Sequence, residues 1–170
     1  MKYISIKFVF IFIIVFTCTK CFAFDKEAYS VATKDIIKMA LFTRPDPDVL
    51  VEMQRALVNM GIVACKERAS INPVDAPLMN LVVSSADEIS SLSIEQITED
   101  WHRYGRATEA GIDVFKSGEY APAISLVNTV TLPSAGIRSA LDYKATRSKK
   151  HLHKLAEDLG KVLKHLEYIP

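Results

Sequence analysis

The sequence predicts an all-α protein, a bundle of about five or six helices that follows a cleaved N-terminal leader. Two observations support this prediction. Apolar residues recur at spacings of three and four in several segments, which places them on one face of an α-helix. Helix-start signals precede some of these segments, such as Asp46 followed by Pro47, and Ser93 followed three residues later by Gln96. Residues 62–83 show neither pattern clearly, and we expect an irregular or weakly β insertion there.

The first 23 residues have the layout of a secretory signal peptide: a basic start, an apolar run over residues 8–16, and small residues at Cys21 and Ala23. Only twelve residues separate Lys7 from Lys20, whereas a membrane-spanning helix needs about 20 apolar residues. We therefore expect cleavage after Ala23 and export to the periplasm or the extracellular space. An uncleaved anchor and a lipid-modified cysteine in the leader are the alternatives.

The mature chain, residues 24–170, has the size of a single domain. The leader holds three of the 21 basic residues and none of the 20 acidic ones, so the mature chain has a formal charge of −2. This balance argues against nucleic acid as a partner. Cys65 is the one cysteine left after cleavage, which excludes a disulfide framework. It is expected either to be buried as a small apolar residue or to pair with another chain.

The first half of the mature chain should begin with two helices joined by a short turn. Residues 25–42 carry an apolar stripe with acidic residues in the first turn, where the helix dipole favours them. Residues 47–60 carry a second stripe, and we expect this helix to end at Gly61 with a left-handed cap. The two helices should form an antiparallel hairpin. Ser84 or Ser85 is then expected to cap a short helical segment.

In the second half, a central helix should begin at Ser93, bend or end at Gly105, and finish by Gly111. Residues 123–132 are rich in β-branched side chains, so strand and helix compete there, and the helical neighbours favour a helix. Pro133 is expected to open the next helix. The clearest stripe closes the chain, with Leu152, Leu155, Leu159, Val162, Leu166 and Ile169 at spacings of three and four.

Glu95, Glu99 and His102 form the most ligand-like group, because Glu-x-x-His on a bundle helix is how di-iron carboxylate proteins present two ligands. The apolar residues of the same segment, expected in the core, are Ile94, Ile97, Trp101 and Tyr104. A continuous α-helix, at 100° per residue, places the three polar residues on the opposite face. We therefore favour a solvated ladder of charges, with a metal or acid–base site as the alternative.

A second group is basic. Lys144, Arg147, Lys149, Lys150 and Lys154 lie in a segment, residues 144–154, that contains no acidic residue. A solvated turn between helices is the simpler interpretation, and a docking surface for acidic partners or an anionic membrane is the alternative. His151 and His153 are two residues apart, which is the wrong spacing for a chelate on a helix. With His165 they indicate an ordinary helix surface, or adventitious zinc or copper binding.

Motifs of known chemistry are missing: there is no Gly-x-Ser-x-Gly, no Walker-type phosphate loop and no Cys-x-x-Cys. We therefore expect an exported, non-enzymatic helical protein that binds a partner protein or a small ligand, for instance in envelope upkeep, without a cofactor. A metal-binding or enzymatic bundle using His102 with Glu95 or Glu99 is the second hypothesis. A docking protein acting through the 144–154 cluster is the third.

Overall fold

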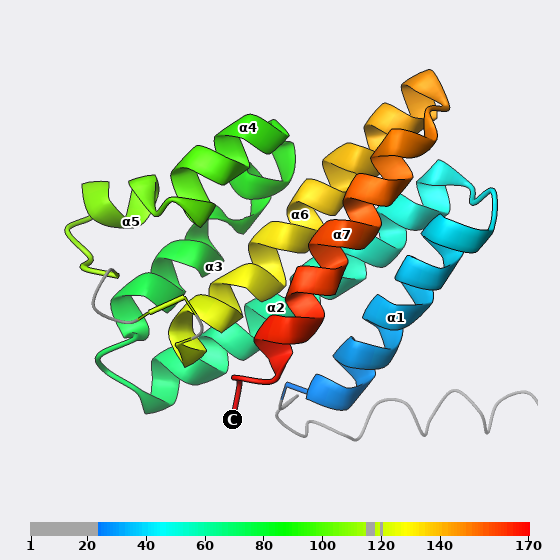
Figure 1. The fold of residues 1–170 in the computed structure, drawn as a ribbon. Helices are drawn as coiled ribbons and strands as arrows, with labels where there is room; N and C mark the ends of the chain where they lie inside the picture. The colour runs from blue at the N-terminus through cyan, green and yellow to red at the C-terminus, as the bar shows by residue number, and fades with distance from the viewer. Residues whose placement is uncertain (1–23, 115–117, 120) are drawn as a thin grey trace, which may run out of the picture.

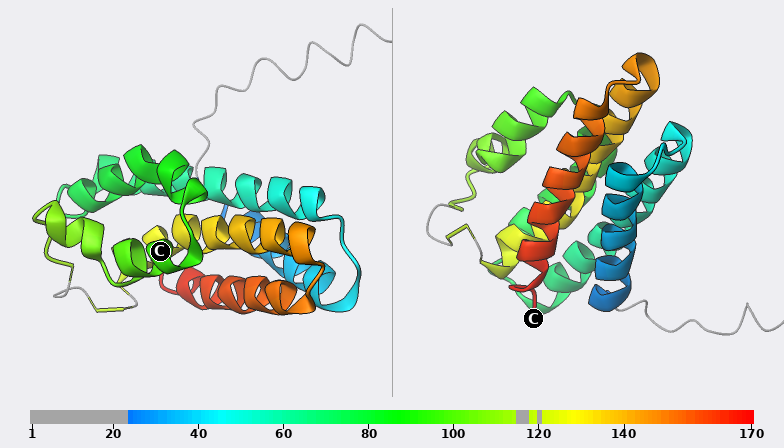
Figure 2. Two further views of the ribbon diagram at one scale, coloured as in Figure 1. Left: turned by 90° about the horizontal axis from the view of Figure 1, so that it is seen from above. Right: turned by 45° about the vertical axis from the view of Figure 1, so that its right-hand side comes forward.

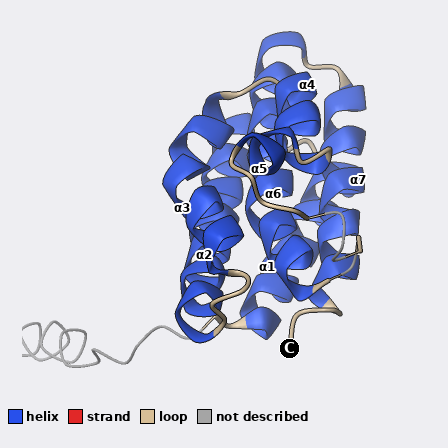
Figure 3. Ribbon diagram, turned by 90° about the vertical axis from the view of Figure 1, so that its left-hand side faces the viewer, coloured by secondary structure: helices blue, strands red, loops and turns tan. Residues whose placement is uncertain are grey.

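A computed structural model describes residues 24–114, 118–119 and 121–170, and the predicted leader lies outside these residues. The described chain is helical throughout, with no strand in these ranges (Figures 1 and 3). Its elements are α1 (Lys26–Phe42), α2 (Pro47–Ile71), α3 (Ala76–Ser91), α4 (Ile94–Ile97), the π-helix η3 (Thr98–His102), α5 (Gly105–Glu109), α6 (Pro122–Thr146) and α7 (Lys149–Leu166). The all-α prediction is confirmed. Within the described ranges, no helix combines the length and the apolarity needed to cross a bilayer.

Helix α6 is the centre of the bundle. It packs against α2, α3 and α7, and the short α4 crosses it as well. The four long helices α1, α2, α6 and α7 run side by side, while α3, α4 and α5 cover one flank (Figures 1 and 2). Every residue of α6 from Ala123 to Ile137 is buried except the half-buried Asn128. A helical segment that is buried almost all round has no solvated polar face, which is why residues 123–132 lack the apolar–polar alternation of an amphipathic surface helix.

The predicted cap at Asp46 holds at the start of α2, and Asp25, which the sequence placed in the first turn of the first helix, caps α1 in the same way. Asp25 accepts a hydrogen bond from the Ala28 amide at 2.8 Å, and Asp46 accepts one from the Asp48 amide at 2.9 Å. The carboxylates thereby satisfy amides that have no partner inside the helix. Cys65 is fully buried beside α6, as expected of a small apolar residue.

The prediction of an irregular or weakly β insertion over residues 62–83 is wrong. Helix α2 continues to Ile71, and α3 begins at Ala76, so both apolar runs of this stretch are helical. Between them lies a short turn held by the ion pair of Arg68 and Asp75, 2.6 Å apart and largely shielded from solvent. The predicted caps at Ser84 and Ser85 are wrong for the same reason, because both residues lie inside α3.

Gly61 does not end α2, contrary to the prediction. A Cβ atom at Gly61 would lie 2.6 Å from the carbonyl oxygen of Thr129 on α6, closer than side-chain atoms tolerate. The missing side chain therefore allows the backbones of α2 and α6 to approach one another. Gly61 is needed for this close approach and not for a left-handed backbone at a helix end.

Pro133 does not open a helix either, because it lies in the interior of α6. Proline has no amide hydrogen, so it cannot donate to the carbonyl of Thr129 four residues earlier. The hydroxyl of Tyr29 on α1 donates to this carbonyl instead, at 2.7 Å, and both groups are buried. A hydrogen bond between α1 and α6 thus replaces the one that Pro133 removes from the helix.

Candidate functional site

The segment after Ser93 begins as predicted. The Ser93 hydroxyl accepts from the Gln96 amide, and the Gln96 side chain accepts from the Ser93 amide, which completes a capping box. After one turn of α4 the chain enters the π-helix η3, in which the Arg103 amide donates to the Thr98 carbonyl at 2.9 Å. The hydrogen bond from residue i+5 to residue i adds one residue to the turn, so the later side chains are rotated by about 100° relative to a continuous α-helix.

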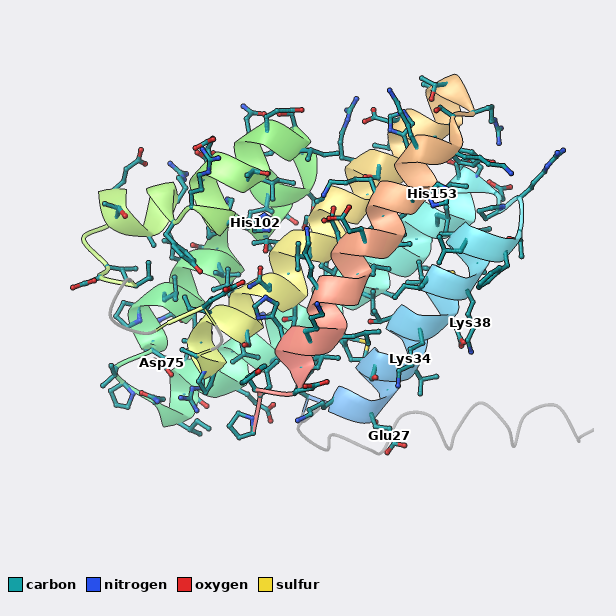
Figure 4. All side chains as sticks on the ribbon, in the orientation of Figure 1. Glu27, Lys34, Lys38, Asp75, His102 and His153 are labelled. Atoms are coloured by element: carbon teal, nitrogen blue, oxygen red, sulfur yellow. The ribbon has the colours of Figure 1, made fainter. Side chains whose placement is uncertain are left out.

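This rotation places His102 on the side of η3 that faces α6 (Figure 4). The expectation that His102 lies with Glu95 and Glu99 on a solvated face is therefore wrong for the histidine. Glu95 and Glu99 are exposed, and Glu99 pairs with Arg103. The three predicted ligands do not converge, and the described residues contain no group of three or more His, Cys, Asp or Glu side chains arranged to hold a metal ion.

The aromatic side of the segment is packed as predicted at Ile97 and Trp101, which are buried. Tyr104 is half-buried and has a left-handed backbone with φ of 62°, so the helical run breaks there. Helix α5 then starts at Gly105, and Gly111, with φ of 72°, follows its end. The left-handed Tyr104 therefore separates η3 from α5, and a loop after α5 leads to α6.

A pocket of about 510 Å³ lies between η3 with Tyr104, the loop between α5 and α6, helix α6 and helix α7. Its described lining is His102, Tyr104, Val114, Gly118, Glu119, Asn128, Leu132, Lys161 and His165. The polar members come from four parts of the chain: η3 with Tyr104, the loop that holds Glu119, helix α6 and helix α7. We call this the His102–His165 pocket.

His165 is buried, with 6% of its surface exposed, although the sequence indicated a surface position. Its Nε2 lies 3.1 Å from Nδ2 of Asn128, and its Nδ1 lies 3.3 Å from the hydroxyl of Ser125. Asn128 Nδ2 also donates to the carbonyl of Ile124 at 3.1 Å, which fixes this atom as the amide nitrogen. It therefore donates to Nε2, so Nε2 carries no proton and the proton of neutral His165 is on Nδ1.

This tautomer decides the role of Ser125. Because Nδ1 of His165 carries the proton, the imidazole donates to the serine oxygen and cannot accept its proton. Nucleophilic catalysis needs the opposite arrangement, in which the base accepts from the hydroxyl. Ser125 is also fully buried. In this arrangement the serine hydroxyl orients the imidazole of His165.

His102 is oriented in a similar way by Thr131 on α6. The Thr131 hydroxyl donates to the Val127 carbonyl at 3.2 Å, so its oxygen acts as an acceptor toward Nε2 of His102, 3.4 Å away. The proton of neutral His102 is then on Nε2, which leaves Nδ1 as a hydrogen-bond acceptor. Burial lowers the pKa of His102 to about 4, against the weaker opposing effect of the Asp158 carboxylate. Burial also lowers the pKa of His165, so both imidazoles are neutral at neutral pH.

The positive charge at the pocket comes from α7. Asp158 is 2% exposed and pairs with Lys154 at 2.6 Å and with Lys161 at 3.3 Å. Lys161 also pairs with Glu157 at 3.0 Å. Burial lowers the pKa of Lys161, but the hydrogen bonds and charges of the two carboxylates outweigh it and raise the pKa overall. Lys161 therefore presents a stable positive charge at the pocket wall.

The sequence did contain a signal for this site. Ser125, Asn128 and Thr131 recur every three residues within a largely apolar segment, and buried polar side chains need hydrogen-bond partners. The partners, His102 and His165, are 63 positions apart in the chain, and spacing alone could not bring them together.

The predicted basic cluster lies around the turn between α6 and α7. Lys144 pairs with Asp48 at 2.7 Å, and Lys154 belongs to the Asp158 network described above. The guanidinium of Arg147 lies over the Tyr143 ring, 5.5 Å from its centre. Lys149 and Lys150 are exposed in the first turn of α7. His151 is half-buried and His153 exposed, so the two do not form a site with the buried His165.

Comparison with known proteins gives no family for this chain: no family model, no curated protein and no solved structure matches it.

Proposed function

We propose that this protein is exported and binds a small polar molecule in the His102–His165 pocket, without transforming it. One observation carries the proposal: polar side chains from η3, α6 and α7 converge on a single cavity of about 510 Å³. A cavity of this size with a few oriented polar groups is typical of small-molecule sites. The absence of an activated nucleophile at Ser125 favours binding over catalysis.

The chemistry of the lining indicates the class of ligand. Nδ1 of His102 accepts hydrogen bonds, and so does the amide oxygen of Asn128, whose nitrogen is already committed. Lys161 adds a positive charge and Glu119 a negative one. This set suits a small molecule with hydroxyl or amino donors and one anionic group, such as a hydroxy acid or an amino acid.

The test is a thermal-shift screen of the purified protein with hydroxy acids, amino acids, sugars and nucleosides, followed by calorimetry on the compounds that stabilise it. Asn128→Ala should weaken binding about tenfold, since one hydrogen bond contributes about 1.4 kcal/mol. Lys34→Ala, an exposed change on α1, is the matched control and should leave the affinity unchanged. Equal affinity in the Asn128 variant, or no ligand among these classes, would contradict the proposal.

Export has its own test. The mass of the protein recovered from the periplasm or medium of a producing cell should correspond to a chain that begins at Phe24. A chain that stays in the cytoplasm with its first residues intact would contradict the export part of the proposal and leave the pocket untouched.

A further inference from the structure

The end of the bundle away from the pocket combines exposed apolar side chains with positive charge. The turn between α1 and α2 lies beside the turn between α6 and α7 in all three views of Figures 1 and 2. The 2.7 Å ion pair of Lys144 and Asp48 joins α6 to α2 at this end. We call residues 41–49 and 144–150 together the basic tip.

The apolar part of the basic tip belongs to the α1–α2 turn. Phe42 is 81% exposed, and Leu41 and Val49 beside it are 40% and 47% exposed. A phenylalanine that folding leaves in water gains nothing from the hydrophobic effect, and transfer of its side chain into an apolar phase is favourable. Neighbouring exposed apolar residues at the end of a molecule are typical of an interaction surface.

The basic tip contains five basic residues and two acidic ones. The acidic pair is Asp46, which caps α2, and Asp48, which pairs with Lys144. The cations left without these acids are Arg44, Arg147, Lys149 and Lys150. The tip therefore has a net positive charge, although the mature chain as a whole is slightly negative.

Two of these cations lie where the dipole of helix α7 is unfavourable to positive charge. Lys149 and Lys150 lie in the first turn of α7, where the helix dipole disfavours positive charge, and the N-cap residue Ser148 makes no side-chain capping bond. Fold stability does not account for cations at this position. An anionic surface in contact with the tip would neutralise them.

We propose that the basic tip docks on an anionic lipid bilayer, with Phe42 inserted among the headgroups and acyl chains and with Lys149 and Lys150 against the phosphates. A bilayer matches both features at once, because it offers negative charge at its surface and an apolar interior immediately beneath. An acidic protein would neutralise the positive charge of the tip but would not offer Phe42 an apolar phase directly beneath that charge. Docking at this end leaves the His102–His165 pocket, which lies in the other half of α6 and α7, at a distance from the membrane.

The experiment places a reporter at the tip of the full chain. In Phe42→Trp, emission from position 42 is followed on vesicles of phosphatidylglycerol and phosphatidylcholine, with and without brominated acyl chains. The parent protein supplies the background, since Trp101 is buried. The added signal should shift to the blue and be quenched by the brominated lipid. Reversing two charges, Lys149→Glu with Lys150→Glu, should weaken binding at least 30-fold, taking about 1 kcal/mol for each basic residue near the surface.

The matched control is Lys34→Glu with Lys66→Glu, which makes the same change in net charge at exposed positions outside the tip and should retain the binding. High salt should release the protein from the vesicles. Emission from position 42 that stays characteristic of water while the protein sediments with vesicles would overturn the proposal, because another part of the chain would then make the contact. Equal losses in the tip and control variants, or capture by soluble polyglutamate in preference to the vesicles, would overturn it as well.

Discussion

Replacing Tyr29 by phenylalanine removes one hydroxyl from a fully buried position and keeps the aromatic ring in place. In the parent protein this hydroxyl donates to the Thr129 carbonyl, which Pro133 leaves without its helical partner. The Tyr29→Phe variant should therefore bury an unsatisfied carbonyl, at a cost of about 1–3 kcal/mol in the free energy of unfolding. The edge contact of the ring with Phe24, 5.6 Å between centres, should remain.

A second substitution separates this cause from simple loss of packing. In Pro133→Ala, the new amide at position 133 can donate to the Thr129 carbonyl, so the carbonyl is satisfied without Tyr29. The cost of Tyr29→Phe should then fall by about 1 kcal/mol in the Pro133→Ala background.

Urea unfolding of the four proteins, followed by circular dichroism and by the fluorescence of the buried Trp101, measures this coupling. If Tyr29→Phe costs the same in both backgrounds, the carbonyl is not what the hydroxyl stabilises, and our account of Pro133 inside α6 is refuted.

Three further predictions concern packing, burial and charge. Gly61→Ala should lower the free energy of unfolding by about 1–3 kcal/mol, because the new Cβ would lie 2.6 Å from the α6 backbone. Gly160→Ala is the control: the space around Gly160 is open, so this change should raise the free energy of unfolding by about 0.5–1 kcal/mol. Gln54→Met should stabilise the protein by about 1–2 kcal/mol in the same assay, since both amide atoms of this fully buried side chain find no hydrogen-bond partner in the described structure; a loss would show that the amide is satisfied. The unfolded state takes up a proton at His102 near pH 6.5, and the folded state only near pH 4, so stability should be full above pH 6.5 and fall by up to about 3 kcal/mol between the two values. Between pH 7.5 and pH 4.5, the free energy of unfolding should fall less in His102→Gln than in the exposed control His153→Gln. An equal fall in the two variants would contradict the lowered pKa of His102 in the folded protein.

The sequence predicted best where a single helix face is buried. Helix α7 has one apolar stripe, and the residues of that stripe, from Leu152 to Leu166, are buried at the expected spacings of three and four. Two N-terminal caps were also predicted correctly, at Asp46 and Ser93, because a cap depends on residues within one turn of each other. The wrong predictions at Gly61 and Pro133 share a cause. Glycine and proline were interpreted as marks of a helix end or start, but each of these two residues lies inside a helix and is accommodated by a neighbouring helix that is distant in sequence.

The same distinction holds for the candidate site. His102 was recognised as ligand-like, but the rotation given by η3 decides where it points, and the periodicity of a regular helix could not reveal that turn. His165 was assigned to the surface because its contacts with Ser125 and Asn128 lie on another helix.

By itself, the sequence determined that residues 24–170 are largely helical, where several helices begin, and that this stretch holds one cysteine and a slightly acidic charge balance. These properties follow from interactions between residues within a few positions of each other. The tertiary structure decided that α6 is buried almost all round from Ala123 to Ile137, that η3 turns His102 inward, and that His102, Asn128, Lys161 and His165 line one pocket. Such arrangements depend on the packing of helices that are far apart in the chain, and periodicity within one helix contains no information about its neighbours.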